Sequence, residues 1–109
     1  KDQIAEQIYS AEDIFISAGT LSELFIVAQT KGVFELTRNF EEELQLQVVP
    51  VTRTTAEQIE KIYMKWGKGF NPACLNFCDC FAYALAKFKG LPLLFIGNDF
   101  KKTDIVSVI

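Results

Sequence analysis

The segment from residue 76 to 87 constrains the fold more than any other part of the chain. It is apolar on almost every side, although Asp79 lies within its first turn. A helix of this kind has to be enclosed by other elements. We therefore expect it at the centre of the domain, with Asn76 as its N-cap and Gly90 just after its end. The carboxylate of Asp79 then needs a backbone cap, a cation or a metal ion as its partner.

Length and composition predict one domain. The chain has 109 residues, of which 50% are hydrophobic, enough for a single core, so we expect residues 1–109 to form one domain. No apolar run is long enough to span a bilayer, and the first residues do not resemble a signal peptide. These features favour a cytoplasmic protein without membrane contact. The net charge of −3 disfavours broad nonspecific binding to nucleic acid, although a local path of lysines could still contact it.

The chain contains no histidine and three cysteines. The absence of histidine excludes Ser-His-Asp and Cys-His catalysis and most transition-metal sites. Three cysteines are too few for a usual four-ligand zinc site, and their odd number and tight spacing do not indicate a disulfide framework. We expect Cys74, Cys78 and Cys80 to be reduced and buried. Any chemistry must therefore rest on carboxylates, lysines, hydroxyls or a hard metal ion.

Apolar runs and amphipathic stretches alternate along the chain. The expected helices lie at about residues 2–11, 20–32, 33–46, 54–66 and 76–90. The expected strands lie at about residues 13–17, 47–51, 91–96 and 105–109. The strands read as continuous apolar runs, which is typical of a parallel sheet covered by helices on both faces. The pattern therefore predicts an α/β fold.

The helix ends and helix faces carry further expectations. Thr20 and Glu23 have the spacing of a capping box at the start of the second helix, and Thr54 or Thr55 is expected to cap the fourth. In the third helix we expect four apolar side chains to be buried, Phe34, Leu36, Phe40 and Leu44. In the fourth helix the expected apolar face consists of Ile59, Ile62, Tyr63 and Trp66.

Three carboxylates are expected at one edge of the sheet. Glu23 and Asp79 lie in the first turns of their helices, and Asp99 follows the strand at 91–96. In an open α/β sheet, sites form outside the carboxyl ends of the strands, so these side chains can converge there, and Asp104 could reach the same crevice. Clustered carboxylates repel one another unless a cation neutralises them. The expected cation is Mg²⁺ or Mn²⁺, which takes oxygen ligands and can activate water.

Each of these acids also has a purely structural interpretation. Glu23 can close its capping box, and Asp79 can do the same with Asn76, since acids in a first turn are favoured by the helix dipole. Asp99 can shape a turn with Asn98. Taken singly, the structural interpretation is preferred for each acid; taken together, they resemble a site. The spacing alone leaves both interpretations open.

Several segments resemble the PIN-domain ribonucleases, and most closely the VapC-like toxins of type II toxin–antitoxin pairs. Residues 72–86 carry a form of that family's Leu-Asn-x-Gly-Asp-Cys segment, and residues 92–100 carry its Gly-Asn-Asp-Phe segment. Residues 16–23 and 103–105 match two further parts of the family pattern. The resemblance implies a three-layer α/β/α sandwich with a mainly parallel central sheet. It also implies hydrolysis of RNA phosphodiester bonds with the help of Mg²⁺ or Mn²⁺.

The resemblance assigns roles to individual residues. Glu23 matches the family's helix-borne Glu, Asp79 and Asp99 match the acids of the two C-terminal segments, and Asp104 matches a further acid near the site. The first three are the implied catalytic residues, and all four are implied metal ligands. Weaker contacts with RNA are assigned to three polar residues, Lys68, Asn76 and Thr103. For Lys68, a solvated loop lysine is the competing interpretation.

Three features depart from the family pattern. The family opens with a strand and an Asp-Thr-Ser sequence that carries its first catalytic Asp, and residues 1–109 contain no match to it; Lys1 falls within the family's first helix. We therefore expect a domain that lacks this first strand and one metal ligand. Cys78 stands where the family usually has Gly, which can shift the turn before Asp79. Phe70 and Asn71 replace a more basic pair, which can weaken RNA binding.

The resemblance also implies partners, and it leaves a second function open. A VapC-like toxin would be neutralised by a VapB-type antitoxin, whose C-terminal tail occupies the acidic groove, and it would form a homodimer. The alternative is a catalytically inactive PIN-fold module that binds protein or RNA, which the missing first Asp and the acidic composition favour. A receiver-like domain is a weaker third interpretation, because the expected adjacent acids after the first strand and the late lysine are not seen.

Overall fold

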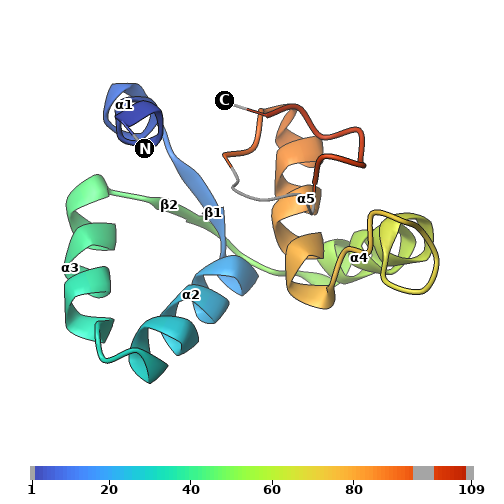
Figure 1. Cartoon of the computed structure of the whole chain (residues 1–109), viewed down its shortest axis with the longest axis horizontal. Helices are drawn as coiled ribbons and strands as arrows, with labels where there is room; N and C mark the ends of the chain where they lie inside the picture. Colours follow the sequence, from blue (N-terminus) through green and yellow to red (C-terminus); the bar gives the residue numbers. More distant parts are fainter. Residues whose placement is uncertain (1, 95–99, 108–109) are drawn as a thin grey trace.

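The computed structural model describes residues 2–94 and 100–107 and contains helices arranged around a short sheet (Figure 1). In chain order the elements are α1 (Asp2–Ser10), β1 (Phe15–Ser17), α2 (Ala18–Thr30), α3 (Phe34–Leu44), β2 (Gln47–Val49), α4 (Arg53–Trp66) and α5 (Phe77–Lys89). Within the described part of the chain, no helix is long and apolar enough to cross a membrane.

The sheet is parallel, as the sequence predicts. Phe15 lies opposite Gln47 and Ser17 lies opposite Val49 in the β1–β2 pair, and the connection between the strands runs through α2 and α3. Such a crossover is what parallel neighbours require. A further parallel bridge joins Leu93 to Ser107. It falls within the predicted strands at 91–96 and 105–109, of which residues 95–96 and 108–109 lie outside the described part.

Helix α5 lies at the centre of the domain, as predicted. It stands between α4 on one side and β1 with the start of α2 on the other (Figure 1). Asn76 caps its first turn, and Gly90 ends it in the left-handed conformation with φ of 66°, which glycine adopts without a steric penalty. Its middle is enclosed, whereas the side chains at its two ends, Phe77 and Phe88, are exposed.

Two small clusters between α5 and its neighbours form the core. The first contains Ile59, Cys80 and Ala84, with Ile62, Tyr63 and Phe81 packed against them. The second contains Leu75, Tyr83 and Phe100, with Ile62, Trp66, Ala82, Leu93 and Ile105 packed against them. The predicted apolar face of α4 is therefore confirmed. The second cluster fastens the C-terminal segment to α4 and α5.

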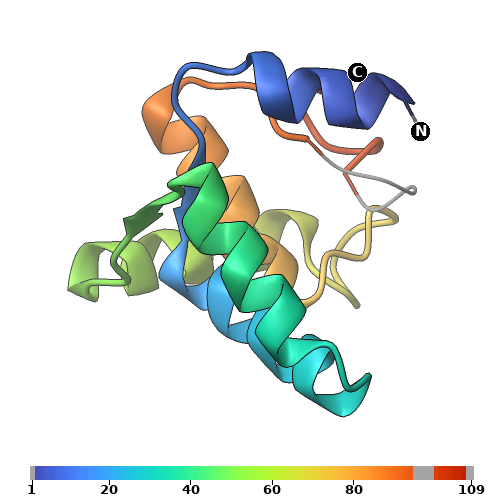
Figure 2. The same ribbon diagram turned by 90° about the vertical axis from the view of Figure 1, so that its left-hand side faces the viewer.

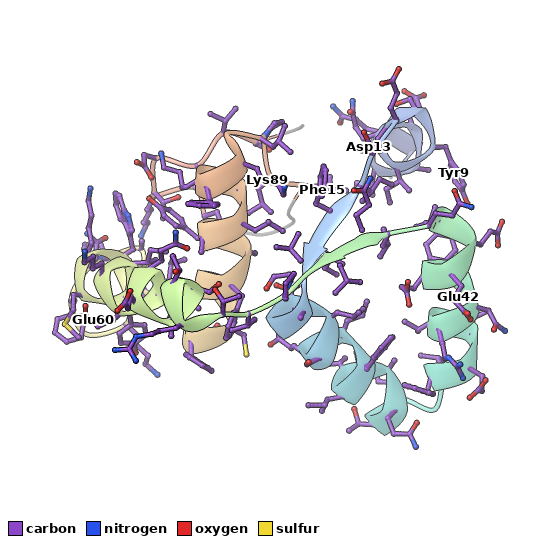
Figure 3. All side chains as sticks on the ribbon, turned by 180° about the vertical axis from the view of Figure 1, so that it is seen from behind. Tyr9, Asp13, Phe15, Glu42, Glu60 and Lys89 are labelled. Carbon is purple, nitrogen blue, oxygen red and sulfur yellow. The ribbon has the colours of Figure 1, made fainter. Side chains whose placement is uncertain are left out.

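A cation–π contact also ties the end of α5 to the sheet. The ammonium of Lys89 lies 4.4 Å from the centre of the Phe15 ring in β1, and Figure 3 shows the two side chains directed at one another. Contacts of this kind contribute about 0.5–1 kcal/mol at exposed positions. Because α2 follows β1 directly, fixing β1 against α5 also fixes where α2 begins.

Helices α2 and α3 form an arm that extends away from α4 and α5 (Figures 1 and 2). The arm is closed by an edge-to-face contact between Phe25 and Phe34, with ring centres 5.3 Å apart. The described part of α3 contains no fully buried residue. Phe34 and Leu44 are half-buried, but Phe40 is exposed and Leu36 is 71% exposed, so the predicted burial of these two is wrong. The reason is that α3 packs mainly against α2.

The predicted start of α2 is also wrong. The helix begins at Ala18, immediately after β1, and the side chain of Ser17 accepts a hydrogen bond of 3.2 Å from the Gly19 amide. Thr20 therefore lies inside the helix rather than at its N-cap, and its hydroxyl is buried with no hydrogen-bond partner among the described residues. Glu23 falls in the second turn instead of the first.

The N-cap of α4 is Thr52 rather than Thr54 or Thr55. The Thr52 hydroxyl accepts from the Thr55 amide, and the Thr55 hydroxyl accepts from the Thr52 amide at 3.1 Å, which completes a capping box. The box lies earlier than predicted because the helix already begins at Arg53, which places the extended residue Thr52 at the N-cap.

Thr52→Ala should therefore lower the free energy of unfolding by about 1 kcal/mol, the usual effect of losing an N-cap side chain. Urea denaturation measures this change. Thr54→Ala is the matched control, because Thr54 lies outside the capping box and should cost only a few tenths of a kcal/mol. Equal losses for the two variants would contradict the assignment of Thr52 as the cap.

Candidate active site

Asp79 occupies the third position of α5 and forms a capping box with Asn76. The Asn76 amide donates to Asp79 Oδ2 at 3.1 Å, and the Asp79 amide donates to Asn76 Oδ1 at 2.9 Å. The structural interpretation of Asp79 is therefore confirmed. It does not compete with metal ligation, because a carboxylate offers about four lone-pair positions on its two oxygens. The cap instead fixes the direction in which this carboxylate points.

Glu23 reaches the same turn of α5 through Cys78. The Cys78 thiol is hydrogen-bonded to the Glu23 carboxylate, and Asp79 lies close enough to act on it. Burial of the thiol, the hydrogen bond to Glu23 and the charges of both carboxylates together raise the pKa of Cys78 above its usual value of 9.0. The thiol is thus protonated at neutral pH and can donate to Glu23. Two carboxylates from α2 and α5, far apart in sequence, therefore both lie near this thiol.

A close approach between the two helices makes this arrangement possible. A Cβ atom added to Gly19 would lie 2.6 Å from the ring of Phe81, well inside van der Waals contact. Gly19 therefore allows the first turn of α2 to rest on the first turns of α5. The sequence offers a signal for this in retrospect, a glycine within the first turn of a helix that follows a strand without a connecting loop.

Asp104 is held by other partners, farther along α5. The Tyr83 hydroxyl donates to Asp104 Oδ1, and Lys87 Nζ forms an ion pair of 2.9 Å with Oδ2. The hydrogen bond from Tyr83 and the charge of Lys87 lower the pKa of Asp104 below its usual range. Trp66 Nε1 donates to the Tyr83 oxygen at 2.9 Å. These contacts join α4, α5 and the C-terminal segment.

The network around Tyr83 should make the fold sensitive to alkali. Burial, followed by the hydrogen bond to Asp104, raises the pKa of Tyr83 from 10.0 to about 12. Between these values the unfolded chain releases the phenol proton while the folded protein keeps it, so the stabilisation is fully present below pH 10 and is lost as the pH rises through about 12. Urea denaturation from pH 9 upward should show this decline, and Tyr83→Phe should flatten it. Parallel declines in both proteins would contradict the assignment.

The described residues do not by themselves complete a metal site. Glu23 and Asp79 each lie near the Cys78 thiol, but in the described ranges no three His, Cys, Asp or Glu side chains are close enough to hold a metal ion. Asp104 is therefore not gathered with these two acids, and Asp99 lies outside the described residues. Carboxylate oxygens are the donors that Mg²⁺ and Mn²⁺ take, and a protonated thiol is a poor ligand. The residues present thus fit a hard cation.

The residues predicted to meet RNA differ in their surroundings. Lys68 is exposed, and its amide donates to the Leu75 carbonyl at 2.9 Å, which places it beside the start of α5. The Asn76 side chain is used in the capping box. The Thr103 hydroxyl donates to the Phe100 carbonyl at 2.7 Å and accepts from the Ile105 amide at 3.2 Å. Thr103 therefore shapes a turn and is half-buried, whereas Lys68 and Asn76 are both exposed.

The three cysteines are all free. Cys80 is fully buried, and burial raises its pKa to about 11, as expected for a small apolar core residue. Cys78 is half-buried and Cys74 is exposed, so the predicted burial is wrong for Cys74. The position of Cys78 between two acids was not foreseen from the sequence, where only its replacement of a glycine stands out.

Comparisons with known proteins agree with the resemblance in the sequence. The family model for the PIN domain matches residues 1–106. Ribonuclease VapC36 of Mycobacterium tuberculosis (strain ATCC 25618 / H37Rv) is 34% identical over 108 residues, which cover 94% of this chain and 76% of that protein. VapC ribonuclease R02377 of Rhizobium meliloti (strain 1021) is 36% identical over 102 residues, which cover 84% of this chain and 71% of that protein.

A third relative matches a shorter part of the chain more strongly. Ribonuclease VapC30 of Mycobacterium tuberculosis (strain ATCC 25618 / H37Rv) is 46% identical over 63 residues, which cover 58% of this chain and 48% of that protein. The family match spans nearly the whole chain, and the parallel strand pair with its surrounding helices agrees with an α/β fold of this type. The chain therefore belongs to the PIN-domain family, with VapC ribonucleases among its relatives.

Proposed function

We propose that this protein is a metal-dependent endoribonuclease of the VapC kind, which hydrolyses phosphodiester bonds in RNA. The observation that carries the proposal is the close packing of α2 on α5 at Gly19 and Phe81, which places Glu23 near Cys78, the residue before Asp79. The relatives named as VapC ribonucleases support the reaction class. The absence of histidine fits a hydrolysis that depends on carboxylates and a hard cation.

Each residue of the proposed site has a role that its surroundings support. Glu23 and Asp79 would hold Mg²⁺ or Mn²⁺, with Asp99 as the further catalytic ligand predicted from the sequence. When bound, such an ion lowers the pKa of a water molecule and stabilises charge on the phosphoryl oxygens. The capping box orients Asp79, and the Cys78 thiol orients Glu23. Asp104 stays a predicted ligand, but its contacts with Lys87 and Tyr83 favour a role in fastening the C-terminal segment.

The direct test is cleavage of RNA by the complete protein, first in EDTA and then after addition of Mg²⁺ or Mn²⁺. We expect cleavage only with the added cation. Glu23→Gln should abolish most of it, whereas Glu35→Gln, the matched control on the exposed start of α3, should cleave as the unmodified protein does. Cleavage that persists in EDTA, or equal loss in the two variants, would contradict the proposal.

The partners of VapC-like toxins are proposed here on the same basis. We expect a VapB-type antitoxin to neutralise the protein by placing its C-terminal tail in the acidic groove, and we expect a homodimer. The exposed apolar side chains of the α2–α3 arm, among them Ile26 and Leu36, are compatible with a protein partner. We place the protein's action in the cytoplasm, because that is where its RNA substrate would be.

The second candidate function is an inactive PIN-fold module that binds protein or RNA. The observation that favours it is the distance of Asp104 from the other acids, since in the described part of the chain no group of three ligands forms. A protein of this kind would neither bind Mn²⁺ nor cleave RNA, so metal binding by the complete protein separates the two functions.

A further inference from the structure

The first residue of α5 is a phenylalanine whose side chain lies largely in solvent. Phe77 is 62% exposed, although an aromatic ring of this size is usually covered. The ring is nevertheless held in place, because it packs edge-to-face on Phe81 with ring centres 5.1 Å apart and an angle of 75°. Phe81 in turn rests against Gly19. The Phe77 ring is therefore exposed but is held in position by its contact with Phe81.

The surroundings of Phe77 are those of the proposed site. It directly precedes Cys78, whose thiol contacts Glu23, and it lies two residues before Asp79. Lys68 is exposed, and its amide donates to the carbonyl of Leu75, two residues before Phe77. A scissile phosphate near the two carboxylates would place its neighbouring bases within reach of this ring, and the ammonium of Lys68 could meet a phosphate of the same strand.

We propose that Phe77 stacks on an unpaired nucleobase next to the scissile phosphate, so that this residue selects RNA whose bases are accessible. The inference rests on the proposed function. Aromatic side chains bind unpaired bases through their faces, largely independently of sequence, whereas bases inside a duplex are already stacked. A protein segment could cover the ring instead, but Lys68 and a cation held by the neighbouring acids would favour a phosphate-bearing nucleic acid over an apolar peptide.

Helix α5 also supplies a matched control. Phe88 is 74% exposed, but it lies eleven residues later, roughly 16 Å along the helix axis. It has the same chemistry and the same helical context as Phe77, and it is far from Glu23 and Asp79. A general effect of removing exposed phenylalanine would therefore appear equally at both positions.

The test measures binding of the complete protein to a 2′-O-methyl single-stranded oligonucleotide, which cannot be cleaved, by fluorescence anisotropy. Phe77→Ala should raise the Kd by roughly 5- to 160-fold, the range for loss of one stacked base. Phe77→Trp should bind about as tightly as the unmodified protein, and so should Phe88→Ala. The matching duplex should bind Phe77→Ala and the unmodified protein equally. Thermal melting of each variant shows whether it is folded.

Three results would overturn the inference. The first is unchanged binding by Phe77→Ala, which would indicate that the Phe77 ring contacts a protein and not RNA. The second is a loss that Phe77→Trp does not restore, which would indicate a structural role. The third is no binding of the oligonucleotide by the unmodified protein. The proposed function is tested separately, by metal-dependent cleavage of RNA by the unmodified protein. If that cleavage is seen but Phe77→Ala binds RNA normally, only the inference about Phe77 is contradicted.

Discussion

Asp79→Asn should reduce RNA cleavage by about 1,000-fold or more while leaving the melting temperature nearly unchanged. Asparagine can still accept the hydrogen bond from the Asn76 amide, so the capping box survives. It is neutral, however, and would weaken the hold on a divalent cation. That cation supplies several kcal/mol of transition-state stabilisation, and each 1.36 kcal/mol corresponds to a factor of ten in rate.

A second substitution at this position separates the two roles of the carboxylate. Asp79→Ala should lose cleavage to the same extent and should also lower the free energy of unfolding, by roughly 1 kcal/mol, because its side chain no longer reaches the Asn76 amide. Cleavage rates with Mn²⁺ and thermal melting of both variants check this. Cleavage by Asp79→Asn at the unmodified rate would show that Asp79 only caps the helix.

Gly19→Val should destabilise the protein by about 3 kcal/mol, the upper part of the range for overpacking a close contact. The added Cβ would lie 2.6 Å from the Phe81 ring, so α2 and α5 would have to separate. Glu23 and Asp79 reside on these two helices, and a displacement of about 1 Å at a catalytic site can cost about 100-fold in rate. Urea denaturation and RNA cleavage measure the two effects.

The matched control for Gly19→Val is Ser22→Val, which places the same β-branched residue on the exposed surface of α2. It should cost less than about 1 kcal/mol. Adding Phe81→Leu to Gly19→Val should recover part of the lost stability, because a smaller side chain opens space for the new methyl groups. A stability loss no larger than that of Ser22→Val would show that the approach of the two helices does not depend on Gly19.

The central helix could be predicted because its signals are local. Asn76 and Gly90 mark its ends, and its nearly continuous apolar surface requires that other elements enclose it. The capping box between Asn76 and Asp79 was one of the alternatives that the spacing left open, and the structure confirms it. Family membership, too, follows from local segments that the family match bears out.

The errors arose where distant parts of the chain decide the outcome. The sequence predicts a late start for α2 because it does not reveal that β1 passes into the helix without a turn, which makes Ser17 the cap. Leu36 has the spacing of a buried residue but is exposed, since α3 packs mainly on α2. The attachment of Asp104 to Lys87 and Tyr83 depends on the path of the C-terminal segment, which no local pattern describes.

The most direct test of the account is calorimetric titration of Mn²⁺ into the complete protein and into Asp79→Asn. We expect the unmodified protein to bind Mn²⁺ and the variant, equally folded by thermal melting, to bind it at least about tenfold more weakly, since even a residue that only supports a ligand changes metal affinity by 10- to 100-fold. No binding by the unmodified protein, or equal binding by both, would contradict the claim that Asp79 helps to hold the catalytic metal.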